Sequence, residues 1–264
     1  MPEPLHVIAA GSRMPAPTAT VPRRVLVVGG GGALGSATLE ALLGLHRFAQ
    51  VGVAACRPVS PAMRGLTIVE DTDAAWRDFG PESALIVFDR TRHANGRDDA
   101  FSRPQPHDLR QVAARLHASG ARDLVVAVPH APALLPQALR AGLASLDEGA
   151  VAALGFERIV FMRLAQTGTA PDASQTSALQ RLATWMLGQL HWMIPSSELP
   201  VRAATVARVA AQLVLELPAA AAGTRVLPPE LLKQAAQGRD AADLVPAWLA
   251  GQPLAPLRMP PLRL

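Results

Sequence analysis

A short apolar run, four consecutive glycines and a leucine-rich helical pattern follow one another between Arg23 and Leu43, and this stretch constrains the fold more than any other. Residues 25–28 read Val-Leu-Val-Val, which is typical of a strand buried on both faces. After the glycines, leucines recur at helical spacing at positions 34, 39, 42 and 43. The sequence therefore predicts a strand, a glycine turn and a helix, in that order.

Gly29, Gly32 and Gly35 fall at G-x-x-G-x-x-G spacing within this stretch. In a strand–turn–helix frame the first glycine permits a sharp turn, the second lets the backbone approach a pyrophosphate, and the third lets the helix pack closely on the strand. The start of the helix also offers unpaired N–H groups to a phosphate, among them those of Ala33 and Leu34. We predict a nucleotide-binding loop, and a flexible turn without a ligand is the alternative.

Strand-like and helical patterns alternate along the rest of the first two thirds of the chain, which predicts a parallel sheet covered on both faces. We expect a doubly wound α/β fold of the Rossmann type with a small, mostly helical C-terminal lobe. Further strands are predicted at 51–55, 66–69, 84–88, 124–128 and 159–163. Helices are predicted at 33–47, 74–79, 107–119, 135–153, 175–192 and 206–217.

The predicted organisation has three parts. Residues 1–22 are rich in proline and small residues and form a flexible arm, residues 23–165 form the dinucleotide-binding domain, and residues 166–264 form the C-terminal lobe. We expect the lobe to pack as part of the same unit, to end in a proline-rich tail from Pro246, and to offer a surface to a protein partner. An apolar stripe within 175–192 is either a core-facing helix face or a wall over a substrate.

Composition excludes several classes of function. The pI of about 10.7 accompanies a net charge of only +4, and the basic residues are nearly all scattered arginines, so we expect no nucleic-acid binding. The single Cys56 excludes an intrachain disulfide and a cysteine-based zinc site, and the histidines lack metal-ligand spacing. No apolar run is long enough to cross a membrane and no signal peptide is recognised, so we expect a cytoplasmic protein.

Four stretches together resemble the atypical short-chain dehydrogenase/reductase superfamily, closest to its branch of small oxidoreductases of the HIV Tat-interactive type. "VLVVGGGGALGSATLEALL" is similar to the glycine loop of that family, and "ACRP" sets Arg57 after the second strand. "FDRTRHANGRDDAF" resembles the segment after the fourth strand, and "LGFERIVFMRL" resembles an L-G-F-x-x-x-x-I-x-R-P pattern. The resemblance covers roughly residues 23–235 and implies a nicotinamide dinucleotide as cofactor and a small-molecule substrate.

Arg57 points to the identity of the cofactor. A carboxylate after the second strand would bind the ribose 2′-OH of NAD, whereas an arginine suits the 2′-phosphate of NADP. No acid follows the second strand before Glu70, so the sequence favours NADP. The resemblance also sets Asp71 where the wider family keeps an acid near adenine, and an ordinary turn aspartate is the alternative.

The usual catalytic groups of the family are missing. Carbonyl-reducing members use a tyrosine and a lysine at Y-x-x-x-K spacing with a nearby serine, and this chain has no tyrosine. Alignment on the family pattern sets Arg140 at the tyrosine position and Ala144 at the lysine position, with Pro129 or His130 at the serine position. His130, expected just beyond the fifth strand, is the candidate proton donor, and Arg140 could polarise a carbonyl.

The resemblance sets Asp89, Arg90 and Thr91 at the G-T-T positions that lie beside the dinucleotide in the family. Asp89 replaces the glycine there, and a carboxylate would repel the phosphates of a dinucleotide unless Arg90 or Arg92 neutralised it.

Three functions stay open on the sequence. The first is an NADP-binding protein with a binding or regulatory role or weak reductase activity. The second is an active NADPH-dependent oxidoreductase that uses His130 or water as the acid, and the third is a cofactor-free interaction module. No metal site is predicted.

Overall fold

The computed structural model describes residues 23–60, 63–89, 98–130, 147–165 and 201–254. Seven parallel strands form one sheet in the order β3-β2-β1-β4-β5-β6-β7. The strands are β1 (Arg23–Val28), β2 (Phe48–Ala55), β3 (Leu66–Glu70), β4 (Ser83–Val87), β5 (Asp123–His130), β6 (Arg158–Ala165) and β7 (Gly223–Leu227). The expected doubly wound α/β fold of the Rossmann type is confirmed.

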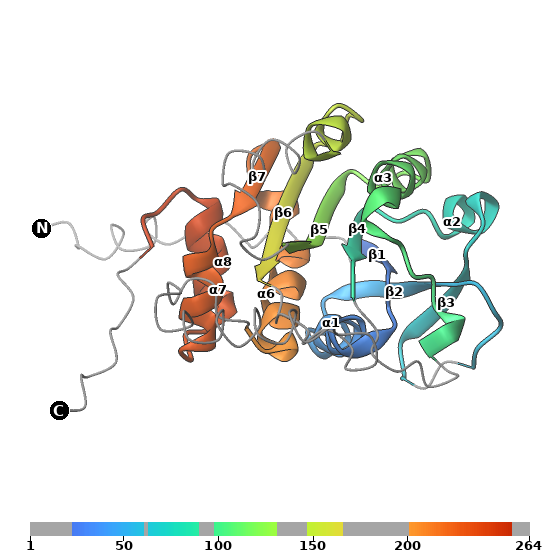
Figure 1. Cartoon of the computed structure of the whole chain (residues 1–264), viewed down its shortest axis with the longest axis horizontal. Helices are drawn as coiled ribbons and strands as arrows, with labels where there is room; N and C mark the ends of the chain where they lie inside the picture. The colour runs from blue at the N-terminus through green and yellow to red at the C-terminus, as the bar shows by residue number, and fades with distance from the viewer. Residues whose placement is uncertain (1–22, 61–62, 90–97, 131–146, 166–200, 255–264) are drawn as a thin grey trace, which may run out of the picture.

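Helices cover both faces of the sheet (Figure 1). On one face lie α1 (Gly32–Gly44), α6 (Ala203–Glu216), α7 (Pro229–Ala236) and α8 (Ala241–Leu249). On the other lie α2 (Asp73–Phe79), α3 (Leu109–Ala118) and a helical segment at 147–152. Short 3₁₀ turns occur at Asp98–Ala100, Pro106–Asp108 and Leu217–Ala219.

Apolar periodicity explains these elements. Val25, Leu26 and Val27 of β1 have no exposed surface, because the strand lies mid-sheet with helices on both faces. Leu39 and Leu42 of α1 face the sheet at helical spacing, and α6 packs beside α1 through a stripe of valines and alanines. Two cores result, one on each face of the sheet.

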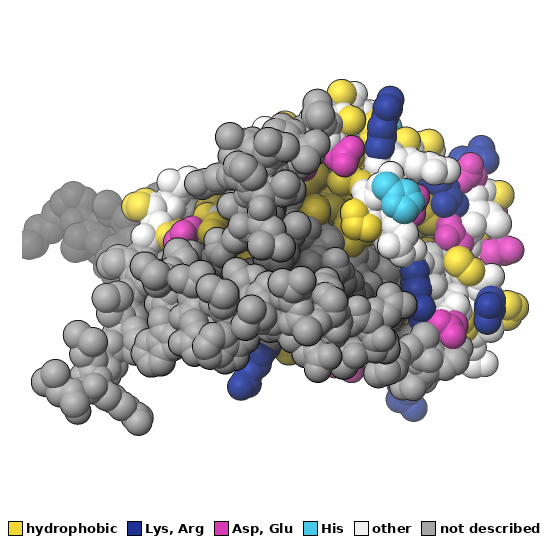
Figure 2. All heavy atoms as spheres, in the orientation of Figure 1, with side chains coloured by type: hydrophobic (Ala, Val, Ile, Leu, Met, Phe, Trp, Pro, Cys, Tyr) yellow, Lys and Arg dark blue, Asp and Glu magenta, His cyan; other side chains and the backbone are white. Residues whose placement is uncertain are grey.

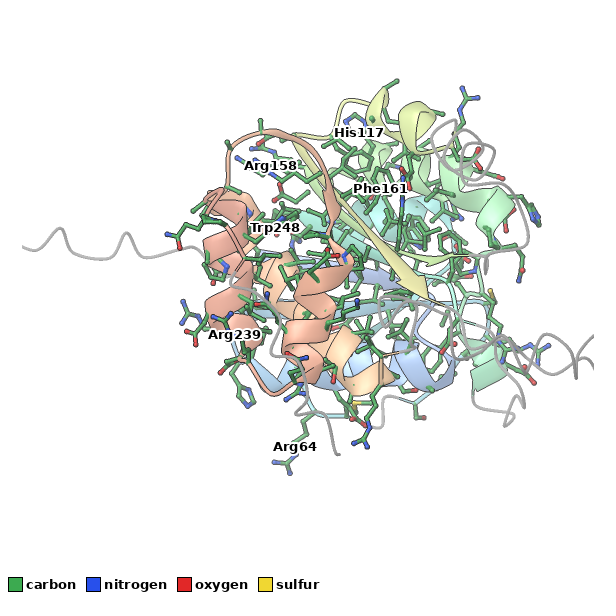
Figure 3. All side chains as sticks on the ribbon, turned by 60° about the vertical axis from the view of Figure 1, so that its left-hand side comes forward. Arg64, His117, Arg158, Phe161, Arg239 and Trp248 are labelled. Atoms are coloured by element: carbon green, nitrogen blue, oxygen red, sulfur yellow. The ribbon has the colours of Figure 1, made fainter. Side chains whose placement is uncertain are left out.

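The C-terminal region extends the sheet, which the sequence pattern did not predict. β7 pairs with the outer side of β6, from Arg158 opposite Gly223 to Met162 opposite Leu227. Pro246, expected to begin a proline-rich tail, lies inside α8, which Asp240 caps by accepting a hydrogen bond from the backbone N–H of Ala242. Figure 3 shows Trp248 on α8 and the buried Phe161 on β6. The described residues 201–254 therefore contribute a strand and three helices to the same layered unit.

Charged side chains of both signs are interspersed over the described part of the face in Figure 2. Among the described residues, no helix is both long and apolar enough to cross a membrane. The arm at 1–22 and the helix expected at 175–192 lie outside the described residues.

Candidate functional site

The strand order of this sheet reverses between β1 and β4. The chain runs from β1 outward through β2 to β3, and then resumes at β4 on the other side of β1. In open α/β sheets, ligands bind outside the carboxyl ends of the strands at this change of direction. The glycine stretch follows β1 directly, so it lies at that position.

The glycines of this loop are required by the backbone. Gly29 has φ +97°, and a Cβ there would overlap the carbonyl oxygen of Val87 at the end of β4. Gly32 begins α1 with φ +77°. A Cβ on Gly35 would meet the backbone of Gly29 and Gly30, with the Gly30 carbonyl carbon 2.6 Å away. The first and third glycines thus have the tight-turn and close-packing geometry that the spacing predicts.

The N-terminus of α1 receives its acceptor from a distant part of the chain. Its N-cap is Gly31, which has no side chain, and its first turn contains no acid. The carboxylate of Asp89, two residues beyond β4, accepts a hydrogen bond from the backbone N–H of Leu34 at 2.7 Å. Leu34 is the third residue of the helix, and N–H groups in that turn have no partner within the helix. Asp89 therefore acts as a long-range cap.

Arg57 lies two residues after β2, as expected, and it is exposed. Its backbone N–H donates to the carbonyl oxygen of Ala100 at 3.3 Å, and the N–H of Cys56 donates to the same oxygen at 2.8 Å. Phe101 pairs with Ala55 in an antiparallel bridge and is buried. The segment after β4 thus holds the backbone of the β2 turn. No carboxylate among the described residues pairs with the Arg57 guanidinium.

Asp71 lies beside this turn, at the end of β3, and its carboxylate is already engaged. It forms an ion pair of 2.9 Å with Arg115 of α3, and its second oxygen lies 3.7 Å from the thiol of Cys56. Burial alone would lower the pKa of the Arg115 guanidinium, but hydrogen bonds and charges from Asp73 and Asp71 outweigh it and raise that pKa. Asp71 has a structural role here, whether or not it also contacts a ligand.

The candidate catalytic residues are only partly described. His130 is the last residue of β5, paired with Ala165 of β6, and not the loop residue that we expected. It belongs to the same sheet edge as the glycine loop, and the structure describes its backbone only. Arg140, Arg90, Thr91 and Arg92 lie outside the described residues. The described parts of the chain contain no cluster of side chains able to hold a metal ion.

One charged pair at this edge was missed by the sequence reasoning. Arg163, near the end of β6, donates two hydrogen bonds to Glu148 of the segment 147–152, at 3.1 and 2.7 Å. These hydrogen bonds raise the pKa of Arg163 against the opposing effect of burial. Nothing in the local sequence signals the contact, because the two residues lie on different elements.

The opposite edge of the sheet holds a charged hollow of about 570 Å³, lined in part by Arg23, Glu82 and Arg158. Arg158 pairs with Asp123 at 2.9 Å and with Glu157 at 3.0 Å. Burial raises the pKa of Asp123 despite the nearby Arg158. These partners join the amino ends of β5 and β6, so the hollow is bordered by structural ion pairs and is remote from the glycine loop.

Comparison with known proteins gives overall structural likenesses. No protein-family model and no curated protein matches the chain. The Bordetella bronchiseptica enzyme WbmG, solved with NAD, is 15% identical over 88% of this chain and 80% of its own, with a TM-score of 0.41. A Staphylococcus aureus nucleoside-diphosphate-sugar epimerase is 12% identical over 86% and 89%, with a TM-score of 0.47. An Agrobacterium tumefaciens short-chain dehydrogenase/reductase superfamily protein with bound NAD is 19% identical over 87% and 84%, with a TM-score of 0.43.

At these identities the fold assignment rests on the chain's own features. The strand order and the glycine turn between β1 and α1 define a doubly wound α/β protein of the Rossmann type.

Proposed function

We propose that the protein binds a nicotinamide dinucleotide, with the pyrophosphate at the loop from Gly29 to Gly35. The observation that supports this most directly is the geometry of the loop. Gly29 and Gly35 leave no room for a side chain, and the loop ends in the N-terminus of α1 where the strand order reverses. The amides of Ala33 and Leu34 would hold the phosphates, and the cofactor when bound would supply hydride chemistry.

Arg57 supports NADP as the preferred form of the cofactor. Its exposed side chain follows β2, and a guanidinium at that position suits a phosphate on the ribose. NADPH should bind at least about tenfold more tightly than NADH, which corresponds to about 1.4 kcal/mol.

Calorimetric titration with NADPH and NADH tests this proposal. Arg57→Ala should remove the preference for NADPH without changing the affinity for NADH. Arg64→Ala is the matched control, since Arg64 is also exposed but lies before β3, and Figure 3 shows it extending away from the protein. Equal affinities for both cofactors in the unmodified protein, or an unchanged preference in Arg57→Ala, would refute the role of Arg57.

We further propose that carbonyl reduction by this protein is slow or absent. The chain has no tyrosine to donate the proton, and a positioned acid supplies about 10²–10⁴-fold in rate. His130 at the end of β5 is the side chain that could restore part of this factor. Turnover of NADPH over a panel of aldehydes and ketones tests the proposal. Activity that depends on His130 should vanish in His130→Ala, and rapid activity that survives this change would show that the chemistry lies elsewhere.

A cofactor-free interaction module is the second candidate, and the contact between Asp89 and Leu34 favours it. A carboxylate already satisfies the N-terminus of α1, so the fold does not need a phosphate there. Failure of both dinucleotides to bind at millimolar concentration would favour this function over the first.

A further inference from the structure

Asp89 takes the same hydrogen-bond donor that a dinucleotide would need. Its Oδ2 accepts the N–H of Leu34 at 2.7 Å, across 55 residues of sequence. Leu34 lies between Gly32 and Gly35, the interval whose amides face a pyrophosphate in glycine loops of this kind. One N–H cannot give a full hydrogen bond to a carboxylate and to a phosphate at once.

Charge adds to this competition. The start of α1 is an anion site because its amides and the helix dipole are positive there, and the loop supplies no side-chain cap of its own. Asp89 provides one negative charge at that place. A pyrophosphate bound to the same amides would place further negative charge next to the Asp89 carboxylate, and these like charges would repel each other.

Residues 100–102, further along the chain, contact the end of β2. Ala100 accepts hydrogen bonds from the backbone N–H groups of Cys56 and Arg57, and the N–H of Ser102 donates to the carbonyl of Ala54 at 3.0 Å. Residues that follow β4 therefore contact both α1 and the end of β2. Asp89 itself directly follows the buried Phe88, whose backbone N–H donates to the carbonyl oxygen of Ala127 at 3.3 Å, so its position at Leu34 is set by the end of β4.

We infer that Asp89 is an internal competitor of the dinucleotide pyrophosphate and sets the affinity of the site. This inference rests on the proposed dinucleotide binding. A dinucleotide binds only when the Asp89 carboxylate releases the Leu34 N–H, so the unmodified protein binds weakly. Removal of the carboxylate leaves the amide free for the phosphate. The phosphate then replaces the Asp89 carboxylate as the acceptor at the N-terminus of α1, and the glycine loop itself does not change.

Titration of NADPH into four proteins tests the inference: the unmodified chain, Asp89→Ala, Asp89→Asn and Asp78→Asn. Asp89→Ala should bind NADPH about tenfold or more tightly than the unmodified chain, a gain of about 1.4 kcal/mol. Asp89→Asn should gain less, because its amide oxygen still accepts from Leu34 but carries no charge. Asp78→Asn is the control for net charge, since Asp78 is an exposed residue of α2, and it should bind as the unmodified protein does.

A second ligand shows whether the gain in affinity arises at the pyrophosphate. Adenosine 2′-monophosphate carries the phosphate directed at Arg57 but no pyrophosphate, so Asp89→Ala should leave its affinity unchanged. An equal gain for both ligands would overturn the inference, because the effect would then not arise at the pyrophosphate. Thermal unfolding of each protein without ligand confirms that it is folded, and Asp89→Asn alone decides the test if Asp89→Ala does not fold.

The possible failures are distinguishable. If NADPH binds the unmodified protein as tightly as it binds both Asp89 variants, Asp89 is no competitor, although the proposed function stands. If NADPH binds none of the four proteins, the proposed function fails and this inference fails with it.

Discussion

The N-termini of α1 and α2 obtain acceptors for their unpaired backbone N–H groups in different ways. In α2 the sequence itself supplies the cap, because the Thr72 side chain accepts a hydrogen bond from the Ala75 N–H and Asp73 lies in the first turn. In α1 the three residues before the helix are glycines, and the acceptor comes from Asp89, which follows three further strands in the sequence. A helix start without a local cap is open to a ligand or to a distant side chain.

The difference separates two uses of a helix start. The cap of α2 is local and only stabilises the helix. The cap of α1 stabilises the helix and also occupies the proposed phosphate position. A substitution at the α2 cap should therefore change stability alone, whereas a substitution at the α1 cap should change stability and ligand affinity in opposite directions.

The largest expected effect comes from the glycine that lets α1 approach the loop. Gly35→Ala adds a Cβ that meets the backbone of Gly29 and Gly30, which cannot yield as a side chain could. We expect a net loss of about 2–3 kcal/mol in the free energy of unfolding, measured by urea denaturation. Gly44→Ala is the matched control in the same helix, since a Cβ there meets nothing within 4 Å. It should stabilise the protein by about 0.4–1 kcal/mol.

If Gly35→Ala were as stable as Gly44→Ala, the close approach of α1 to its loop would not be essential. The comparison of the two helix starts would then lose its basis, since a wider loop would leave room for a local cap.

Next in size is the effect of the long-range cap itself. Asp89→Ala removes the acceptor of the Leu34 N–H, and loss of a helix cap costs about 0.5–2 kcal/mol. Thermal and urea unfolding without ligand should show this loss. Asp89→Asn should lose less, because it keeps an acceptor. An Asp89→Ala protein as stable as the unmodified one would mean that water serves the α1 amides equally well.

The strand order explains why the sequence predicted the fold but not this cap. Buried runs such as Val25–Val28 and the glycine turn after it depend on nearest neighbours, so local pattern suffices for them. The partner of Leu34 depends on β4 lying next to β1, which no local pattern contains. The sequence did show that α1 lacks a local side-chain cap. A helix that directly follows glycines needs an acceptor from elsewhere for its first N–H groups.

Two other errors have equally physical causes. β7 reads Gly-Thr-Arg-Val-Leu, and only Leu227 of this strand is buried, so an edge strand with so little apolar pattern does not stand out. A proline-rich tail was expected from Pro246, yet α8 includes this proline, because the apolar side of the helix packs on the core. In both places the tertiary neighbours outweigh the local signal.

The local cap of α2 should give a comparable but purely structural effect. Thr72→Ala removes the acceptor of the Ala75 N–H at 3.2 Å and should cost about 0.5–1 kcal/mol of stability, measured by urea denaturation. Thr72→Ser keeps the hydroxyl and should stay near the unmodified protein. NADPH affinity should be the same in all three proteins. A gain in affinity for Thr72→Ala would show that any loss of stability loosens the site, which would undermine the distinct role of Asp89.

The smallest expected effect is the coupling that ties the start of α2 to α3. Arg115 donates from Nε to Asp73 at 2.6 Å, pairs with Asp71, and lies 4.0 Å above the ring of Trp76. The carboxylate of Asp73 is largely exposed, so its pair with Arg115 should contribute only about 0.2–1 kcal/mol. A double-mutant cycle with Arg115→Met and Asp73→Ala measures this coupling apart from the packing of the Arg115 stem on Trp76.

Arg115→Met alone should cost more than Asp73→Ala, because it also leaves the less exposed Asp71 without its cation. The coupling should weaken as salt is raised, as expected for a partly exposed pair. A coupling well above 1 kcal/mol would mean that the start of α2 also depends on a distant side chain. Both helix starts would then depend on a distant side chain, and they would differ only in that α1 has no local cap.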